Sequence, residues 1–243
     1  MALTLTETFM NVFVSLLQSP SPLPIMLASM GFFLTIYLGF AGIVWLIAQR
    51  VDRPIELRPL SHSQIRTEIF NSLRSIVLFG LGMIFAWGAY QIGWVDISRD
   101  VGVSQVLLEM LLLVLWNDLY TYAIHRFLHV KLKKTHVTHH KSITATPFTA
   151  YSMSSLEALL LGAVLPTAML LHDFSAAALV FLPLWSILIN TLSHSNCDFF
   201  PNAKKGSLLG FIRHHQTHHS HYHNNFGFFF SHLDTWLGTR RSK

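Results

Sequence analysis

Long apolar stretches restrict the folds open to this chain more than any other feature of its sequence. Residues from about 25 to 48, 75 to 95 and 103 to 124 form three such stretches. As a helix, each is long enough to cross a hydrocarbon core about 30 Å thick. Only 12% of the residues are charged, whereas a soluble domain usually carries about 25%. We therefore expect an all-α integral membrane protein.

A fourth apolar region, residues 156–192, differs from the other three because it is interrupted. His172 and Asp173 divide it into two segments, and each segment contains a proline, Pro166 or Pro183. Both segments are short for independent spans, so we expect a tight transmembrane hairpin or a re-entrant pair. The chain, residues 1–243, is then predicted to be a single membrane-embedded catalytic domain with about four transmembrane helices and an interfacial N-terminal segment, residues 1–24.

Lysine and arginine are distributed unevenly among the predicted loops. All but one of the 17 lie within residues 49–74, 125–141 and 204–243, and Arg99 alone lies in a loop assigned to the other side. A four-span topology places the three basic segments on one membrane face, which the positive-inside rule makes cytoplasmic. This topology accounts for the net charge of +5 without a nucleic-acid partner. Residues 125–155 and 193–243 would then form a cap on the cytoplasmic side of a bacterial inner membrane or of the endoplasmic reticulum.

The predicted cap contains most of the 15 histidines of the chain. One cluster, residues 125–140, reads H-R-F-L-H-V-K-L-K-K-T-H-V-T-H-H, and a second, residues 213–223, reads R-H-H-Q-T-H-H-S-H-Y-H. Histidines three or four positions apart on a helix project from one face, and neutral imidazole is the commonest metal ligand in proteins. Because both clusters lie on the same side of the predicted membrane, we expect them to form one metal site.

The composition of these clusters limits the metals that they could bind. Cys197 is the only cysteine, which excludes a Cys-based zinc or iron–sulfur site, and the H-E-x-x-H motif of zinc proteases is absent. The clusters contain no carboxylate, so Mg²⁺ and Ca²⁺ are poor fits, whereas imidazole suits iron, zinc, copper or nickel. At least nine histidines share this face, and a structural zinc site uses only four ligands. Two metal ions with about five ligands each fit this number.

These motifs resemble the fatty acid hydroxylase/sterol desaturase superfamily, whose members are membrane enzymes with a histidine-rich di-iron centre. The similarity lies in H-R-F-L-H (125–129), H-V-T-H-H (136–140) and H-Q-T-H-H (215–219) with N-F-G (225–227), and it extends from about Asp118 to Thr239. The resemblance implies that two iron ions are bound by His125, His129, His136, His139, His140, His194, His215, His218 and His219. Some members carry a further histidine at the position of Asn190, which makes this residue a candidate for the tenth ligand.

Carboxylates near the predicted ligands are candidates for supporting them. Ligating histidines usually donate their second N–H to a carboxylate or a carbonyl. Asp118 lies seven residues before His125 on the same predicted helix face, so we expect it to hydrogen-bond a ligating histidine. The alternative is an interhelical hydrogen bond with no role toward the metal. Glu157 and Asp234 are further candidates, and no catalytic residue beyond the metal centre is predicted.

The resemblance implies an oxidoreductase that uses O₂ as co-substrate to hydroxylate or desaturate an unactivated C–H bond of a lipid. The chain has no cytochrome b5-like segment, so we expect a separate electron-donor protein, cytochrome b5-like or ferredoxin-like. Two other classes are alternatives. A histidine-rich metal transporter would need polar ligands near the bilayer midplane, and a bis-histidine haem membrane protein would need histidines paired across two spans. The sequence does not identify the lipid.

Overall fold

The structure is a computed structural model that describes residues 5–98, 101–204 and 206–241. These residues form helices and connecting loops with two isolated β-bridges, which confirms the predicted all-α class. The helices are α1 (Leu5–Gln18), α2 (Leu23–Val51), α3 (His62–Gln91), α4 (Val103–Lys131), α5 (Lys133–His140), η1 (Pro147–Tyr151), α6 (Ser155–Gly162), α7 (Val164–Met169), α8 (Ala176–Ser193), η2 (Leu208–Gly210), α9 (Phe211–Ser220) and α10 (His232–Trp236). Arg99, which we assigned to the far side of the membrane, lies outside the described residues.

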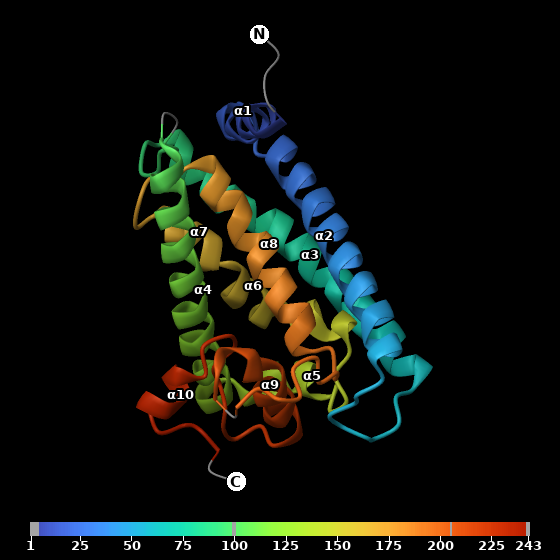
Figure 1. Cartoon of the computed structure of the whole chain (residues 1–243). Helices are drawn as coiled ribbons and strands as arrows, with labels where there is room; N and C mark the ends of the chain where they lie inside the picture. The colour runs from blue at the N-terminus through green and yellow to red at the C-terminus, as the bar shows by residue number, and fades with distance from the viewer. Residues whose placement is uncertain (1–4, 99–100, 205, 242–243) are drawn as a thin grey trace.

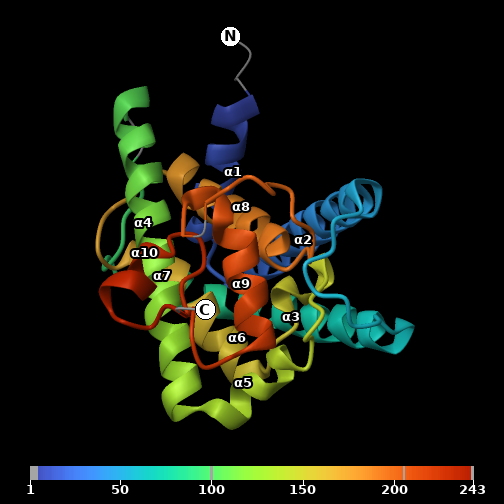
Figure 2. The same ribbon diagram turned by 60° about the horizontal axis from the view of Figure 1, so that its bottom comes forward.

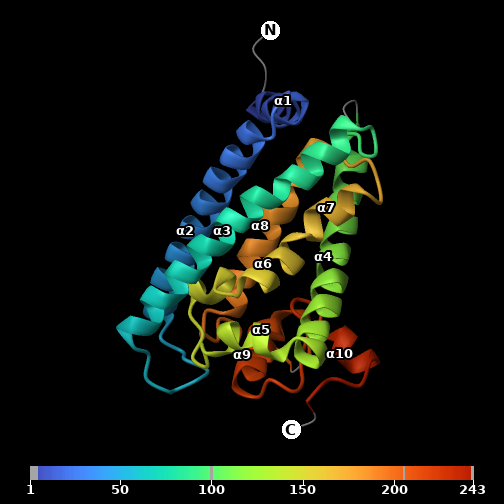
Figure 3. The ribbon, with the colours of Figure 1, turned by 180° about the vertical axis from the view of Figure 1, so that it is seen from behind.

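Four helices, α2, α3, α4 and α8, are long and apolar enough to cross a membrane, which confirms the predicted number. They run between the two ends of the molecule (Figures 1 and 3). Helix α1 lies at one end, and α5, α9 and α10 lie at the other. The two histidine clusters therefore lie at the same end of the helices.

Helix α1 packs across the other end of the bundle. Leu17 is fully buried, and its carbonyl oxygen accepts a hydrogen bond from Gln91 Nε2 at 2.7 Å. Trp87 Nε1 donates to the carbonyl oxygen of Ser19 at 2.9 Å. The end of α1 and the turn that follows it are therefore held by polar side chains from the last turns of α3.

Helices α3 and α4 extend beyond the apolar stretches from which we predicted them. Helix α3 begins at His62 rather than near residue 75, because Ser61 caps it by accepting a hydrogen bond from Gln64 N. Helix α4 continues without a break to Lys131. Hydropathy marks only the part of a helix that faces lipid or the core, so these polar ends were not detected. The extension of α4 puts His125 and His129 on the last turns of a membrane-crossing helix.

The interrupted region, residues 156–192, forms two helical segments of unequal length. The second segment, α8, is a continuous helix of 18 residues, whereas the first is shorter and broken between α6 and α7. A serine side chain caps the start of each segment, because Ser154 accepts a hydrogen bond from Glu157 N and Ser175 accepts one from Ala178 N. Glu109 on α4 accepts a hydrogen bond from Ser175 N at 2.8 Å, which attaches the start of α8 to α4.

Helices α2 and α3 approach closely at Gly80. A Cβ added to Gly80 would lie 2.2 Å from Met30 Cγ and 2.9 Å from the carbonyl oxygen of Met26, whereas one added to Gly82 would meet nothing within 4 Å. Small residues permit close approach of helices in membranes, where dispersion contacts replace the hydrophobic driving force.

We predict that Gly80→Ala lowers the thermal stability of the detergent-solubilised protein, because overpacking of a tight contact costs about 1–3 kcal/mol. Gly82→Ala is the matched control. It adds the same methyl group to the same helix in open space and should leave stability unchanged or raise it by up to about 1 kcal/mol through helix propensity. Circular dichroism melting curves of both variants make the comparison, and equal melting temperatures would contradict the close-packing interpretation.

Candidate metal centre

All nine histidines that we expected to bind metal come together in two groups at one end of the bundle. Within each group, one nitrogen atom per residue lies within 4.8 Å of those of the others. The first group, here called the five-histidine group, consists of His125, His129, His136, His140 and His218. The second, the four-histidine group, consists of His139, His194, His215 and His219. Viewed from this end, α9 lies at the centre with α4 and α5 around it (Figure 2).

Helices α5 and α9 each contribute to both groups. In the H-x-x-H-H motif of α5, the first and last histidines join the five-histidine group, and His139 joins the other. On α9 the arrangement is reversed, because only His218 joins the five-histidine group. Residues four apart lie nearly above one another on a helix, and the residue three after the first lies to one side. Because of this spacing, one turn of a single helix provides histidines to both groups.

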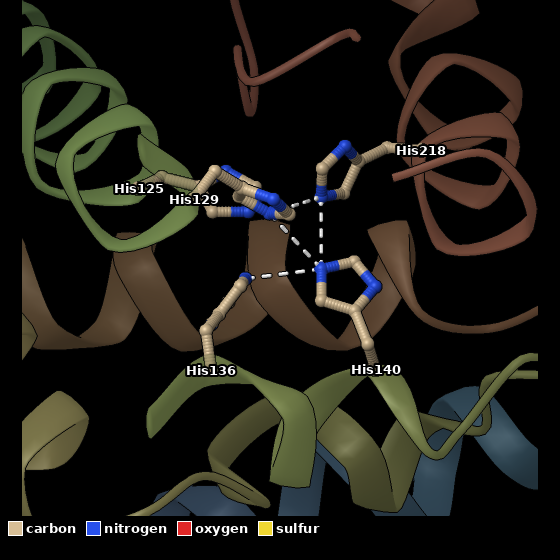
Figure 4. Close-up of side chains that lie close together, drawn as sticks. All are labelled: His125, His129, His136, His140 and His218. Carbon is tan, nitrogen blue, oxygen red and sulfur yellow. Dashed lines mark hydrogen bonds between the residues drawn. The ribbon is translucent and has the colours of Figure 1, made fainter. Parts of the chain in front are cut away.

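The five-histidine group has the nitrogen spacing of a metal coordination shell. His140 Nε2 lies 3.1 Å from His129 Nε2, 3.0 Å from His136 Nε2 and 3.1 Å from His218 Nε2, and all these side chains point inward (Figure 4). Two imidazole nitrogens each about 2.1 Å from one metal ion are about 3.0 Å apart at a right angle and about 3.4 Å apart at the tetrahedral angle. The observed distances fit the right-angled arrangement of five- or six-coordinate metals.

The four-histidine group has similar spacing. His194 Nε2 lies 3.2 Å from His139 Nε2 and 3.0 Å from His215 Nε2. His219 Nε2 is buried without a hydrogen-bond partner, as is His125 Nε2 in the other group. A buried polar nitrogen without a partner is costly, and a metal ion bound by its lone pair removes this cost. The donor atoms of both groups therefore fit metal ions.

Hydrogen bonds at Nδ1 determine the orientation of most of these rings. The Nδ1 atoms of six histidines contact oxygen atoms at 2.7–3.1 Å, namely His125 with Phe226 O, His136 with Glu157 Oε1, His139 with Ser152 O, His194 with Asn190 O, His218 with Asn224 O and His219 with Ser142 O. A ring that donates Nδ1–H keeps a lone pair on Nε2, and such bonds also fix the ring orientation of metal ligands. All six rings are thus prepared to bind metal through Nε2.

Burial keeps the rings in the neutral form that binds metals. Removal from water lowers the pKa of His139 to about 4. It also lowers the pKa of His136, His215, His218 and His219 well below the usual value. Because desolvation disfavours the charged form, these imidazoles are neutral at pH 7.

Two of the carboxylates that we singled out do not contact either histidine group. Asp118 accepts hydrogen bonds at Oδ1 from Phe229 N at 2.9 Å and Phe230 N at 3.1 Å. The expected bond to a ligating histidine is therefore wrong, since the neighbouring loop turns its backbone N–H groups toward this carboxylate. Asp234 holds the same loop at Phe226 N and Gly227 N, at 2.8 and 2.7 Å. Both residues thus fix the loop whose Phe226 carbonyl contacts His125.

Glu157 does contact a histidine of the site, as we considered. Its Oε1 lies 2.7 Å from His136 Nδ1, and both side chains are buried. His214, next to His215 in the sequence, points away from both groups and contacts Asp234 Oδ2 at 2.8 Å. Sequence reasoning missed the backbone carbonyls of Ser142, Ser152, Asn224 and Phe226, because a carbonyl is common to every residue and leaves no signal in the sequence.

The fold and the site together define a helical membrane protein with two histidine groups suited to metal ions at one end. The fatty acid hydroxylase family model matches residues 110–239, which is more than half of the chain, so the chain belongs to this family. This result confirms the resemblance of the histidine motifs. No solved structure matches the chain significantly.

The curated relatives include several sterol-modifying proteins. The chain is 28% identical over 140 residues to the Delta(7)-sterol 5(6)-desaturase erg31 of Schizosaccharomyces pombe, covering 55% of this chain and 44% of the relative. It is 31% identical over 136 residues to the Delta(7)-sterol 5(6)-desaturase ERG3A of Gibberella zeae, covering 54% and 37%. Human lathosterol oxidase is 28% identical over 134 residues, covering 54% and 44%. The chain thus matches less than half of the length of each of these relatives.

Replacing each of two adjacent histidines tests the assignment of ring directions. We predict that His215→Ala lowers the metal content of the purified protein by about one ion per chain. His214→Ala should retain the metal content, because the His214 ring contacts Asp234 instead of either group. Elemental analysis of both variants measures this, and loss of metal from His214→Ala alone would contradict the observed orientation.

The depressed pKa values predict how the metal-free protein responds to acid. His139 takes up a proton below about pH 4 when folded and near pH 6.5 when unfolded. Between these values the unfolded state binds more protons, so the free energy of unfolding falls as pH falls. His139→Gln should reduce this decrease, by about 2 kcal/mol between pH 7 and pH 5 for His139 alone. Denaturant unfolding of both metal-free proteins at pH 7 and pH 5 measures it, and identical pH dependence would disprove the assignment.

Proposed function

We propose that this protein is a membrane-bound oxidoreductase in which two iron ions, O₂ and external electrons act on an unactivated C–H bond of a lipid. The observation that carries the proposal is the convergence of nine histidines, from α4, α5, the end of α8 and α9, into two groups with ligand-like spacing. Membership of the fatty acid hydroxylase family supports an oxidoreductase. The names of the sterol desaturase relatives support a lipid substrate.

Iron is the metal that we propose for both groups, with residues 1–243 acting as one catalytic domain. The ligands would be His125, His129, His136, His140 and His218 at one ion and His139, His194, His215 and His219 at the other. Asn190 lies one helical turn before His194, and its Oδ1 is buried without a hydrogen-bond partner, which makes it our candidate for the tenth ligand. When bound, iron supplies the oxidising power toward O₂ and C–H bonds that side chains lack.

The residues around the centre have separate roles in this proposal. The Glu157 carboxylate orients His136 and increases its basicity as a ligand through the Nδ1 hydrogen bond. Phe226 and Phe228 cover the histidines with apolar surface, their ring centroids lying 5.0 Å from His129 and 4.6 Å from His215. Such covering excludes water from the reacting region. The centre lies where α4 and α8 end, so a lipid could reach it from the bilayer.

The reaction takes one of two outcomes. In hydroxylation, one oxygen atom of O₂ enters the lipid as a hydroxyl group and the other leaves as water. In desaturation, two hydrogen atoms leave the lipid and both oxygen atoms leave as water. Both outcomes require two electrons and two protons from outside, and we propose that a separate cytochrome b5-like or ferredoxin-like protein supplies the electrons.

The side of the membrane on which the centre lies is also part of the proposal. Lys131, Lys133 and Lys134 adjoin the centre at the end of α4 and the start of α5, and the positive-inside rule places such segments in the cytoplasm. A cytoplasmic centre is accessible to soluble electron donors. The basic side chains could contact anionic headgroups or an acidic donor.

The proposal predicts both the metal content and the products. Protein purified in detergent from iron-supplemented cells should contain close to two irons per chain. Reconstituted with lipids, a reductant and a ferredoxin or cytochrome b5, it should form an O₂-dependent hydroxylated or desaturated lipid that mass spectrometry detects. A sterol with a Delta(7) double bond is the first substrate to test, because of the relatives. Fewer than two metal ions per chain would overturn the dinuclear centre.

The control for the product assay is His218→Ala, which removes a proposed ligand from the five-histidine group and should abolish turnover. Two zinc ions in place of iron would preserve the ligand arrangement and abolish the activity, so iron reconstitution would then precede the assay. If the iron-loaded protein forms no oxidised lipid from sterols, fatty acyl lipids or sphingolipids, the proposed reaction is wrong.

A further inference from the structure

Glu68 on α3 is a buried carboxylate that lies apart from both histidine groups. Its side chain is 1% exposed. It accepts hydrogen bonds from three neutral groups, at Oε1 from Gln64 Nε2 and Ser142 Oγ, both at 2.7 Å, and at Oε2 from Thr146 Oγ1 at 2.5 Å. Removing a carboxylate from water is costly, and satisfying it with three donors fixes the positions of all three.

Two of these donors belong to residues 142–152, which connect α5 to α6 and include η1. This segment provides two of the carbonyls that hold the four-histidine group. Ser142 O lies 3.0 Å from His219 Nδ1, and Ser152 O lies 3.1 Å from His139 Nδ1. Glu68 thus binds the side chain of the residue whose backbone carbonyl orients His219.

The link from Glu68 to the second carbonyl runs through η1. Thr146 caps η1, since its Oγ1 accepts a hydrogen bond from Phe148 N at 3.2 Å, and its backbone N–H is bound in turn by Thr149 Oγ1 at 3.0 Å. Ser152 ends this short helix. Helix α3 holds the segment again one turn after Glu68, where Asn71 Nδ2 donates to Ser152 Oγ at 3.3 Å.

We propose that Glu68 is a positioning residue for the metal bound by the four-histidine group. Its carboxylate fixes the Ser142 and Thr146 hydroxyls, so the carbonyls of residues 142 and 152 hold the His219 and His139 rings with Nε2 directed at the metal. The five-histidine group receives none of its Nδ1 hydrogen bonds from this segment. The inference rests on the proposed dinuclear centre, and it assigns a role in that centre to a residue outside the family match at 110–239.

Iron titration of the purified full chain tests this role. The wild type and Glu68→Gln would be titrated anaerobically with Fe²⁺ against a competing chelator, and the two dissociation constants compared. The amide keeps the size of the side chain but turns an N–H₂ group toward one of the hydroxyls. We expect one iron to bind about 10- to 100-fold more weakly, the usual effect of losing a group that supports a metal ligand, and the other to bind as in the wild type.

Glu109→Gln is the matched control. Glu109 is also a buried carboxylate, 2% exposed, that accepts hydrogen bonds from Gln105 Nε2 and Ser175 N, but it lies at the opposite end of α4. This variant should lose thermal stability and bind both irons with wild-type affinity. Equal weakening of both irons in folded Glu68→Gln, or unchanged affinity for both, would overturn the positioning role.

Double variants identify which iron is affected. In a His194→Ala background, which lacks a ligand of the four-histidine group, adding Glu68→Gln should not change the affinity for the remaining iron. In a His218→Ala background it should weaken the remaining iron by the same factor as in the wild type. The opposite pattern would place the effect of Glu68 in the five-histidine group.

A second variant keeps the test valid if Glu68→Gln fails to fold. Ser142→Ala removes one hydroxyl donor to Glu68 and keeps the backbone carbonyl that contacts His219. It should weaken the same iron by a smaller factor, and unchanged affinity in this variant would overturn the proposal. If the wild type itself binds fewer than two irons, the dinuclear centre fails, and this result is distinct from two irons bound equally well in wild type and Glu68→Gln.

Discussion

The rest of the site depends on the hydrogen bonds that six of the nine clustered histidines make through Nδ1. A buried ring has two polar nitrogens, and an acceptor for Nδ1–H holds the ring with the lone pair of Nε2 free to face a metal. For five of the six histidines with such bonds the acceptor is a backbone carbonyl, and for His136 it is Glu157. The loops around the centre are therefore structural parts of it, and their conformations determine where the ligands point.

This requirement explains why three acidic residues bind the loops that contact the histidines. Asp118 and Asp234 bind backbone N–H groups of the loop that includes Phe226, and Glu68 binds hydroxyls of residues 142–152. Each carboxylate stabilises a loop conformation by accepting hydrogen bonds from the N–H or O–H groups of that loop. Because two of these three carboxylates belong to α3 and α4, membrane-crossing helices order the loops that contact the metal ligands.

Much of the fold and of the ligand set could be predicted from the sequence, because hydropathy and histidine spacing are local properties. The apolar stretches predicted four spanning units, and the spacing of His136, His139 and His140 predicted a shared helix face. The start of α3 at His62 was not predictable from hydropathy, since its first turns are polar. The hydrogen-bond partner predicted for Asp118 was also wrong. A seven-residue spacing on a helix identifies a shared face but cannot identify what packs against that face. The motif spacing separates His139 from His136 and His140, but which histidines of the other helices join each group depends on the tertiary arrangement of α4, α5, α8 and α9, which no local pattern specifies.

The division of each H-x-x-H-H motif between the two groups has a consequence for how such sequences can change. Each residue added to a helix turns the following side chains by about 100°. One insertion within the motif of α5 or α9 would therefore misdirect ligands of both ions together, whereas an insertion between the motifs that lies away from His194 and from the carbonyls that bind Nδ1 would rotate no ligand. Lineages of this protein should thus tolerate variation in the lengths between the motifs while the five-residue spacing within each motif stays invariant.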